Sequence, residues 1–253
     1  MDLLEITDNK NRHPWEIARK IIVSKLIDKT QKKNIKILDI GSGDAFLANS
    51  FTKRSKNYYT YCVDTEYTTE LINEIEDGFK NKNLKLHSTL NDVKVDKIDI
   101  TTLLDVIEHV PVDIDFLNGI ISKPYINNTT HFIITVPAYK TLFSEHDELL
   151  KHYRRYNLKS LKQTVNKCNL DVIDGGYFFT ILILPRLVQI LLKKINIKKG
   201  KKNSTLGTWK GGKLITTIIK SILLLDYKIN RCIKVLGINL PGLSCYVICK
   251  KRI

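Results

Sequence analysis

The sequence predicts an α/β fold, in which a mostly parallel sheet carries helices on both faces. Short apolar runs recur along the first half of the chain, and most of them end at glycine or a polar residue. Stretches with helical spacing separate these runs. This alternation is typical of the strand–helix–strand units that build a parallel sheet. With 253 residues the chain can bury a substantial core, as one elaborated domain or as one domain with an insertion.

The first strand is expected at residues 35–40, an apolar run that contains Asp39 and leads into a Gly-Ser-Gly turn at 41–43. The two glycines allow a sharp turn and a close approach of the backbone to a ligand. A dinucleotide-binding turn would need a third glycine, but the chain has Phe46 at that position. An acid at the strand end would also repel a pyrophosphate, whereas it suits a ligand that carries an ammonium and a sulfonium group.

The next two strands add polar groups at the same edge of the expected sheet. Residues 59–63 form a second strand that ends in Asp64, which can accept hydrogen bonds from both hydroxyls of a ribose. A third strand at 84–87 leads into a polar turn with Asn91, where the edge of an adenine could be recognised. The spacing therefore predicts a nucleoside-binding edge.

A fourth strand begins at residue 99 and ends at Asp105, and Glu108-His109 follow it closely. A helix is expected from about Pro111, and a fifth strand covers residues 132–136.

These strand ends, in this order, resemble the class I S-adenosylmethionine-dependent methyltransferases. The similarity is greatest to the small-molecule branch that includes quinone-, sugar- and lipid-pathway enzymes, and it covers about residues 13–178 and the last strand. It implies S-adenosylmethionine as the cofactor. The cofactor-binding residues that it implies are Asp39, Gly41, Ser42, Gly43, Asp64, Asn91 and Asp105.

The resemblance also implies a Rossmann-like sheet of seven strands with helices on both faces. Its last strand would run antiparallel between the fifth and the sixth, with a helical insertion before it. Within a single domain, 1–253, the expected parts are a core at about 30–177 and 244–253, an N-terminal lid helix at about 13–29, and an apolar, basic insertion at about 178–243. A helix that only packs on the sheet is the alternative for residues 13–29.

The positive charge of the chain is concentrated in its last quarter. Residues 193–253 hold 13 Lys and 2 Arg but a single acid, Asp226, and so carry +14 of the formal net charge of +15. The same region has two apolar runs, 177–192 and 214–225, which Pro185-Arg186 and Lys220 interrupt. Both are shorter than the ~20 residues of a membrane-spanning helix. Apolar helices flanked by lysines, some of them in the basic loop 198–204, suit the headgroup layer of an anionic membrane. The alternative is that both runs form a helical cap that packs on the sheet.

A second polar segment, residues 144–156, follows the fifth strand and should face the substrate in this fold. Arginine side chains there could hold a phosphate or carboxylate by forked hydrogen bonds, whereas a solvated amphipathic helix is the alternative. His146 is the first candidate for a general base and His109 the second, because histidine can take up a proton near neutral pH. The candidate substrate-binding residues are Asp147, His152, Tyr153, Arg154 and Arg155.

The predicted chemistry is in-line transfer of the S-methyl group to an oxygen, nitrogen or carbon atom, for which aligning the reactants is the main requirement. The expected acceptor is a small or lipid-linked molecule. An RNA methyltransferase with a basic C-terminal segment and a non-catalytic S-adenosylmethionine-binding module are the alternatives. Nucleic acid is the less favoured partner because the basic segment is apolar and has few aromatic residues for base stacking.

The five cysteines are scattered and form no C-x-x-C pair, which favours reduced thiols in the cytoplasm and argues against a zinc site. No metal is therefore expected. The N-terminus has no apolar signal-peptide core. We expect a cytoplasmic protein that binds peripherally to the inner face of the membrane.

Overall fold

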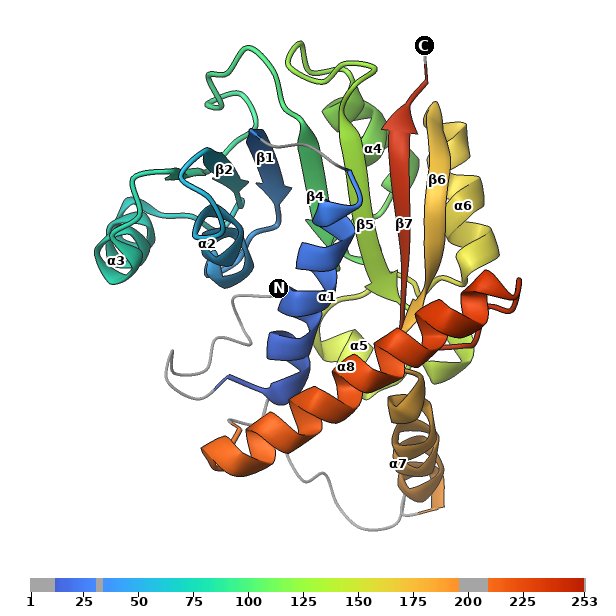
Figure 1. The fold of residues 1–253 in the computed structure, drawn as a ribbon. Helices are drawn as coiled ribbons and strands as arrows, with labels where there is room; N and C mark the ends of the chain where they lie inside the picture. The colour runs from blue at the N-terminus through green and yellow to red at the C-terminus, as the bar shows by residue number, and fades with distance from the viewer. Residues whose placement is uncertain (1–11, 31–33, 196–208, 253) are drawn as a thin grey trace.

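The computed structural model describes residues 12–30, 34–195 and 209–252. Its centre is a seven-stranded sheet with the order β3-β2-β1-β4-β5-β7-β6 (Figure 1). The strands are Ile35–Ile40 (β1), Tyr58–Val63 (β2), Leu84–His87 (β3), Ile100–Leu104 (β4), His131–Pro137 (β5), Leu170–Phe178 (β6) and Ser244–Lys251 (β7).

Strands β1 to β5 are parallel, and β7 lies between β5 and β6 and runs antiparallel to both. This confirms the predicted α/β class, the seven strands and the antiparallel last strand. From β1 the chain builds the sheet first toward β3 and then, from β4 onward, in the other direction. Ligands of such sheets bind beyond the carboxyl ends of the strands at this reversal, between β1 and β4.

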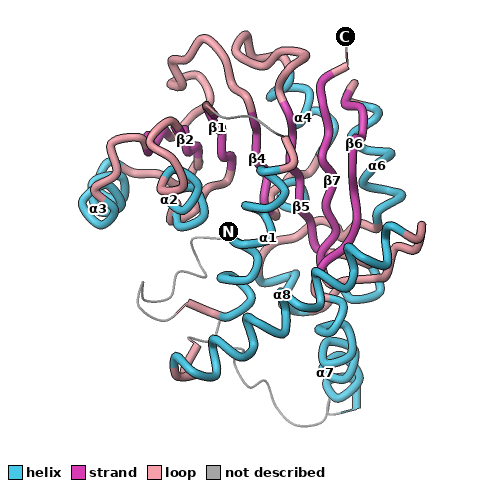
Figure 2. The backbone as a smooth tube through the Cα atoms, viewed as in Figure 1, coloured by secondary structure: helices cyan, strands magenta, loops and turns pink. Residues whose placement is uncertain are grey.

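Helices cover both faces of the sheet (Figures 1 and 2). On one face Ile22 of α1 and Leu223 of α8 share an apolar cluster with Ile133 of β5. On the other face Leu117 of α4 packs in a cluster with Ile134, the next residue of the same strand. Consecutive residues of β5 therefore serve opposite faces, and both are buried, as in other sheets covered on both sides. The helices are Pro14–Asp28 (α1), Phe46–Thr52 (α2), Thr69–Phe79 (α3), Asp113–Ile121 (α4), Glu145–Leu149 (α5), Leu158–Lys167 (α6), Ile183–Ile195 (α7) and Lys213–Val235 (α8).

The two helices before the last strand differ in detail from the sequence pattern. Tyr177 and Phe178 belong to β6, so that α7 starts only at Ile183 and Pro185 lies in its first turn, where proline is tolerated. Lys220 does not break the second run, because α8 continues through it to Val235. A lysine interrupts a run of apolar residues, but it does not interrupt the helix, because its helix propensity is high.

The basic loop 198–204 lies outside the described residues. Within the described ranges, no helix combines the length and the apolar character needed to cross a membrane.

Candidate active site

The glycine turn after β1 is fastened to the end of β2. The backbone N–H of Gly41 donates to Val63 O at 2.8 Å, and that of Gly43 donates to Asp64 Oδ2 at 2.9 Å. Both glycines have positive φ, 66° and 54°. A Cβ at Gly41 would lie 2.6 Å from Cγ2 of Val106, so that the turn has no room for a side chain there. The structure thus brings together three of the predicted cofactor residues.

Asp39 lies behind this turn and is 2% exposed. Its Oδ1 accepts a hydrogen bond from the hydroxyl of Thr102 in β4. Burial raises the pKa of Asp39 to about 6, although the hydrogen bond from Thr102 acts in the opposite direction. Ser42 is also held in place, because its hydroxyl is 2.9 Å from that of Tyr67. The carboxyl groups of Asp39 and Asp64 are therefore fixed on either side of the turn.

Asp105, the residue after β4, is held from two sides. The hydroxyl of Thr135 in β5 donates to Asp105 Oδ1 at 3.0 Å. On the other side Nη1 of Arg19 lies 3.0 Å from Asp105 Oδ2. Arg19 belongs to α1 and is 3% exposed. The N-terminal helix is thus tied to the ends of β4 and β5.

A second buried ion pair joins the start of α1 to the glycine turn. The guanidinium of Arg12 pairs with Asp44 and lies 3.1 Å from Glu16. It also stacks on the ring of Phe46, 4.3 Å from its centroid. Neither the pairing of Arg12 with Asp44 nor a role for Arg19 was predicted from the sequence. The signal that could have found them is three charged residues at positions 12, 16 and 19, spaced as one face of a helix whose neighbours are apolar.

Asn91 does not lie with the other predicted cofactor residues. Its side-chain oxygen accepts a hydrogen bond from Lys123 at 2.7 Å. The preceding carbonyl, of Leu90, accepts one from the hydroxyl of Tyr125, whose own carbonyl binds the backbone of Ile98 just before β4. The segment after β3 has therefore turned back toward the amino ends of the strands by residue 91. The backbone at the end of β3 meets Asp64 instead through His87, whose carbonyl accepts the Asp64 N–H at 3.2 Å.

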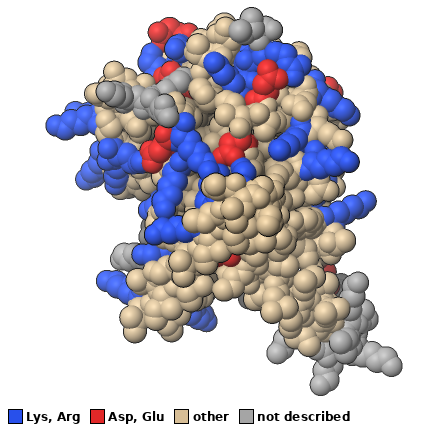
Figure 3. Space-filling view, turned by 45° about the vertical axis from the view of Figure 1, so that its right-hand side comes forward, with Lys and Arg blue, Asp and Glu red and all other residues tan. Residues whose placement is uncertain are grey.

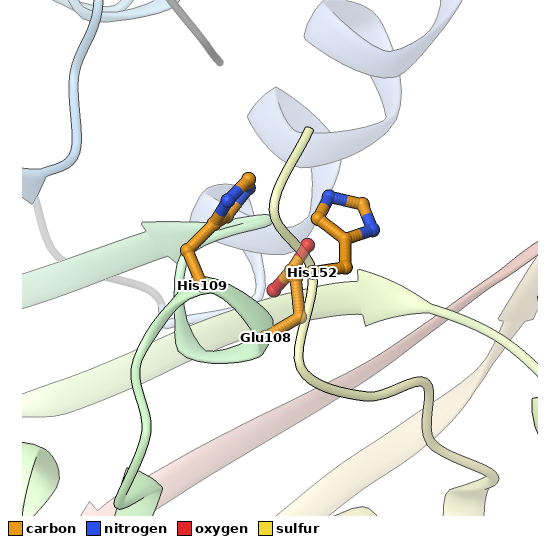
Figure 4. A group of neighbouring side chains, drawn as sticks. All are labelled: Glu108, His109 and His152. Atoms are coloured by element: carbon orange, nitrogen blue, oxygen red, sulfur yellow. The ribbon is translucent and has the colours of Figure 1, made fainter. Parts of the chain in front are cut away.

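Glu108, His109 and His152 form a compact cluster beside the end of β4 (Figure 4). Glu108 and His109 lie in the short 3-10 helix Ile107–His109, and His152 follows α5. The rings of the two histidines pack edge to face with their centroids 4.4 Å apart. Glu108 is fully buried. Burial, and after it the charge of Asp105, raises the pKa of Glu108 well above its ordinary value.

Asp147 is the buried centre of the segment that follows β5. One of its oxygens is 3.0 Å from His152 Nδ1 and 2.6 Å from Arg155 Nε, and the other accepts the backbone N–H of Ser144 at 2.9 Å. Burial acts to raise the pKa of Asp147, but the hydrogen bonds from His152 and Arg155 outweigh it and hold the pKa well below the usual range. Arg186 of α7 reaches the same place and donates to the Ser144 hydroxyl at 2.7 Å.

The other predicted substrate residues have different surroundings. Arg154 donates to Val110 O at 3.1 Å and lies 3.3 Å from Asp113 Oδ1, whereas Arg155 binds Asp147. The two guanidinium groups thus bind separate internal acceptors. Tyr153 is 59% exposed.

His146, the first candidate base, is half-buried in α5. Burial lowers its pKa, and the positive charge of Arg186 lowers it further. Its neutral form, which is the form that can accept a proton, therefore prevails at neutral pH.

The sheet order and the acidic groups along the carboxyl ends of β1, β2 and β4 define a class I methyltransferase architecture. The chain belongs to the methyltransferase-domain family, whose model matches residues 15–174. The protein is accordingly a methyltransferase that uses S-adenosylmethionine.

Solved structures share the fold at low sequence identity. Coclaurine N-methyltransferase bound to N-methylheliamine and SAH has a TM-score of 0.58 at 12% identity, over 98% of this chain and 74% of that one. Haemonchus contortus phosphoethanolamine N-methyltransferase 2 in complex with S-adenosyl-L-methionine gives 0.54 at 15% identity, over 93% and 52%. The cyclase SpnF gives 0.58 at 8% identity, over 97% and 85%. These identities show the fold alone, and the cyclase illustrates that the fold does not fix the reaction. No curated protein matches the chain.

Proposed function

We propose that this methyltransferase acts on a small or lipid-linked acceptor at the surface of an anionic membrane, on the cytoplasmic side. The observation that carries the proposal is an exposed apolar surface on α7 and α8, next to the residues that should face the acceptor. A cytoplasmic location agrees with the cysteines, all five of which are free thiols.

In this proposal the cofactor binds at the carboxyl edge of β1, β2 and β4. Asp64 would accept the ribose hydroxyls, and Asp39 and Asp105 would face the positively charged methionine part. His146, with His109 as the second candidate, would take the proton of an acceptor that must lose one during attack. The glycine turn supplies backbone contacts through Gly41, Ser42 and Gly43.

Both helices turn an apolar face outward. On α8 the exposed positions from Ile215 to Ile229 follow one another at intervals of three or four residues, which places them along one side of the helix. Most of the exposed large apolar side chains of the described residues lie in this part of the chain. Figure 3 shows this surface as a broad area without charged side chains. We call it the apolar platform, and its members are Ile181, Leu184, Leu187, Val188, Leu191, Leu192, Leu214, Ile215, Ile218, Ile222, Leu225 and Ile229.

The charges around the platform are positive. Lys210, Lys213 and Lys228 are exposed on or beside α8. The single acid of this region, Asp226, is engaged internally, because its carboxylate accepts the backbone N–H groups of Thr180 at 2.9 Å and Ile181 at 3.2 Å. An apolar face with lysines at its margins is the pattern of a helix that lies in the headgroup layer and meets anionic lipid.

The platform is connected to the expected acceptor site. Arg186, on the same helix as Leu184 and Leu187, lies 3.5 Å from Asp147 Oδ2 and donates to the Ser144 hydroxyl. An acceptor whose apolar tail stays in the lipid could therefore present its polar end beside residues 144–156. The outward faces of α7 and α8 are aliphatic rather than aromatic, which supports lipid over single-stranded RNA as the partner.

Co-sedimentation with vesicles tests the proposal. The native protein is expected to pellet with vesicles that contain anionic lipid and to stay largely in the supernatant with neutral ones. Ile218→Asp combined with Ile222→Asp should abolish pelleting, because two charges would enter the apolar layer. The control is Ile173→Asp on β6, which is exposed to a similar degree (57%, against 50% for Ile218 and 43% for Ile222) but lies outside the platform. Equal loss in the control, or no preference for anionic vesicles, would contradict the membrane proposal.

A further inference from the structure

The cluster of Glu108, His109 and His152 has a geometry that the methyl-transfer reaction alone does not require. The three side chains come from two separate segments, the turn after β4 and the loop after α5, and they converge in Figure 4. One carboxylate oxygen and one nitrogen from each imidazole lie within 4.8 Å of one another. Only the tertiary fold brings these side chains together, because His152 lies 43 positions after His109 in the sequence.

Glu108 is the most informative member of the cluster. It is 0% exposed, and neither of its carboxylate oxygens has a hydrogen-bond partner among the described residues. Buried polar atoms of folded proteins are nearly always paired, because a carboxylate without a partner loses its hydration and gains nothing in return. Arg19, the nearby buried cation, is engaged by Asp105. Glu108 therefore lacks a compensating positive charge within its own cluster.

His152 is already oriented as a ligand. Its Nδ1 is 3.0 Å from Asp147 Oδ1, and Asp147 is fixed in turn by Arg155 and by the backbone of Ser144. With Nδ1 donating its proton to this carboxylate, Nε2 carries a free lone pair. A carboxylate behind a histidine in this manner is the usual support of a metal-binding imidazole, since it fixes the tautomer and the direction of the ring.

We propose that Glu108, His109 and His152 bind one divalent metal ion through a carboxylate oxygen and two imidazole nitrogens. This ligand set suits the borderline transition ions, such as zinc, cobalt, iron or manganese, rather than calcium, which prefers oxygen ligands throughout. Metal–ligand distances of about 2.0 to 2.2 Å allow two ligand atoms to lie at most about 4.4 Å apart. The ligand atoms of the cluster lie within 4.8 Å of one another, and rotation of the side chains can supply any contraction that the ion requires.

The position of the site suggests its use, and this step rests on the proposed function. Glu108 lies three residues after Asp105, near the edge of the sheet where the cofactor is proposed to bind. Because the protein supplies only three ligands, the ion keeps coordination positions open for other molecules. A hydroxyl of the acceptor bound there would lose its proton to solvent more easily, because the ion stabilises the alkoxide. The oxygen would then form a bond to the methyl carbon as the carbon–sulfur bond breaks and the sulfur keeps the electron pair. The acceptor class is thus an oxygen nucleophile.

Cobalt(II) is the probe for the site, because its visible absorption reports the number and the geometry of the ligands around the ion. The untagged, metal-free protein is titrated with Co²⁺, followed by absorption and by calorimetry, in the absence of cofactor and acceptor. We expect one ion per chain. Glu108→Gln and His152→Ala should each weaken binding by about ten- to hundredfold, whereas His131→Ala, which removes a histidine outside the cluster, should not. His109→Ala serves as a third variant, because His109 is only partly buried and its loss should disturb the fold least.

The site is supported if the native protein saturates at one ion per chain and only the cluster variants bind Co²⁺ more weakly. These variants must still show cooperative thermal unfolding, so that the weaker binding is not caused by unfolding. Native-like binding by both Glu108→Gln and His109→Ala, or no binding by the native protein, would overturn it and leave Glu108 as a buried, protonated carboxyl group. S-adenosylmethionine affinity is measured on the same samples. A protein that binds Co²⁺ but not S-adenosylmethionine would retain the metal site and refute the proposed function, so that the two failures are separable.

Discussion

Arg19 of α1 and Asp105 at the end of β4 form an ion pair across 3.0 Å, in which the arginine is almost fully buried. The pair fastens the N-terminal helix to the edge of the sheet where we propose that the cofactor binds. Because Asp105 also accepts from Thr135, the same carboxylate joins three elements, α1, β4 and β5. A helix held in this manner would form one wall of the proposed cofactor site.

Arg19→Ala should therefore affect both stability and cofactor binding. Removing the arginine leaves Asp105 with an uncompensated, partly buried charge, which should cost about 2 to 3 kcal/mol of unfolding free energy. We expect the affinity for S-adenosylmethionine to fall by about tenfold in calorimetry, because the helix loses its attachment. Lys25→Ala, on the same helix, is the control. Native affinity in the Arg19 variant would show that α1 does not form part of the site.

Gly41→Val tests the glycine turn. The Cβ would meet Val106 at 2.6 Å, and the positive φ of 66° is strained for any β-branched residue. We expect no calorimetric binding of S-adenosylmethionine or its demethylated product. Gly119→Val in α4 is the matched control, because a Cβ there meets no atom within 4 Å, and it should bind as the native chain does. Binding by the Gly41 variant, or tight binding of NAD by the native protein, would refute the assignment of the turn.

Asp39 predicts a pH dependence of cofactor binding. Its pKa is raised to about 6, mainly by burial, so its ionised fraction increases as the pH rises through 6. The ionised form attracts the ammonium group of the cofactor, and affinity should therefore increase from pH 5 to pH 7 and then level off. Asp39→Asn should bind more weakly and without this dependence. If the affinity of the native protein does not change between pH 5 and pH 7, Asp39 does not interact with the cofactor.

The same raised pKa predicts that, without ligand, the stability of the protein decreases as the pH rises, whereas cofactor affinity increases. Because the folded-state pKa lies above the unfolded value, the contribution of Asp39 to stability is complete below the unfolded pKa of about 4. It is lost as the pH rises through about 6. Urea unfolding of the native protein and of Asp39→Asn at pH 5 and pH 7 measures this difference.

The fold could be predicted because its signals are local. The apolar run 35–40 and the glycine turn after it specify β1 and the sharp turn from neighbouring residues alone, and the structure confirms both. Pro185 and Lys220 interrupt the apolar runs of the sequence but not the helices, for a physical reason. Hydropathy registers each as an interruption, whereas the backbone accepts proline in the first turn of a helix and lysine anywhere in it.

The positions of the candidate cofactor-binding residues could be predicted only where these residues lie at the ends of strands. Asp39 and Asp64 end consecutive strands and are therefore placed by topology, but Asn91 lies four residues beyond β3, where the chain has already turned back. The pairs made by Arg12 and Arg19 depend on how α1 crosses the sheet. That crossing is a tertiary property, which no local pattern encodes.

His146→Ala tests the first candidate base. Loss of proton transfer or of acceptor positioning should lower turnover by about a hundredfold, while the affinity for S-adenosylmethionine stays within a few-fold of native. His131→Ala, at the amino end of β5, is the control and should retain native turnover. Unchanged turnover in His146→Ala would assign this histidine a structural role in α5.

The last prediction concerns the lysines between α7 and α8. Lys198, Lys199, Lys201 and Lys202 lie outside the described residues, but the sequence places them between two helices that carry the apolar platform. Each lysine close to an anionic surface contributes about 1 kcal/mol, so four together would hold the protein there reversibly.

Replacing all four by Gln should reduce co-sedimentation with anionic vesicles without lowering the midpoint of thermal unfolding. The native protein should be released in part as salt rises, because the screening length falls to a few ångströms near 1 M. A salt-resistant fraction should remain from the burial of the platform, and this fraction should persist in the Gln variant but vanish in Ile218→Asp with Ile222→Asp. If the Gln variant binds anionic vesicles as the native chain does at every salt concentration, the lysines take no part in membrane binding. The charge concentrated in the last quarter of the chain would then need another explanation.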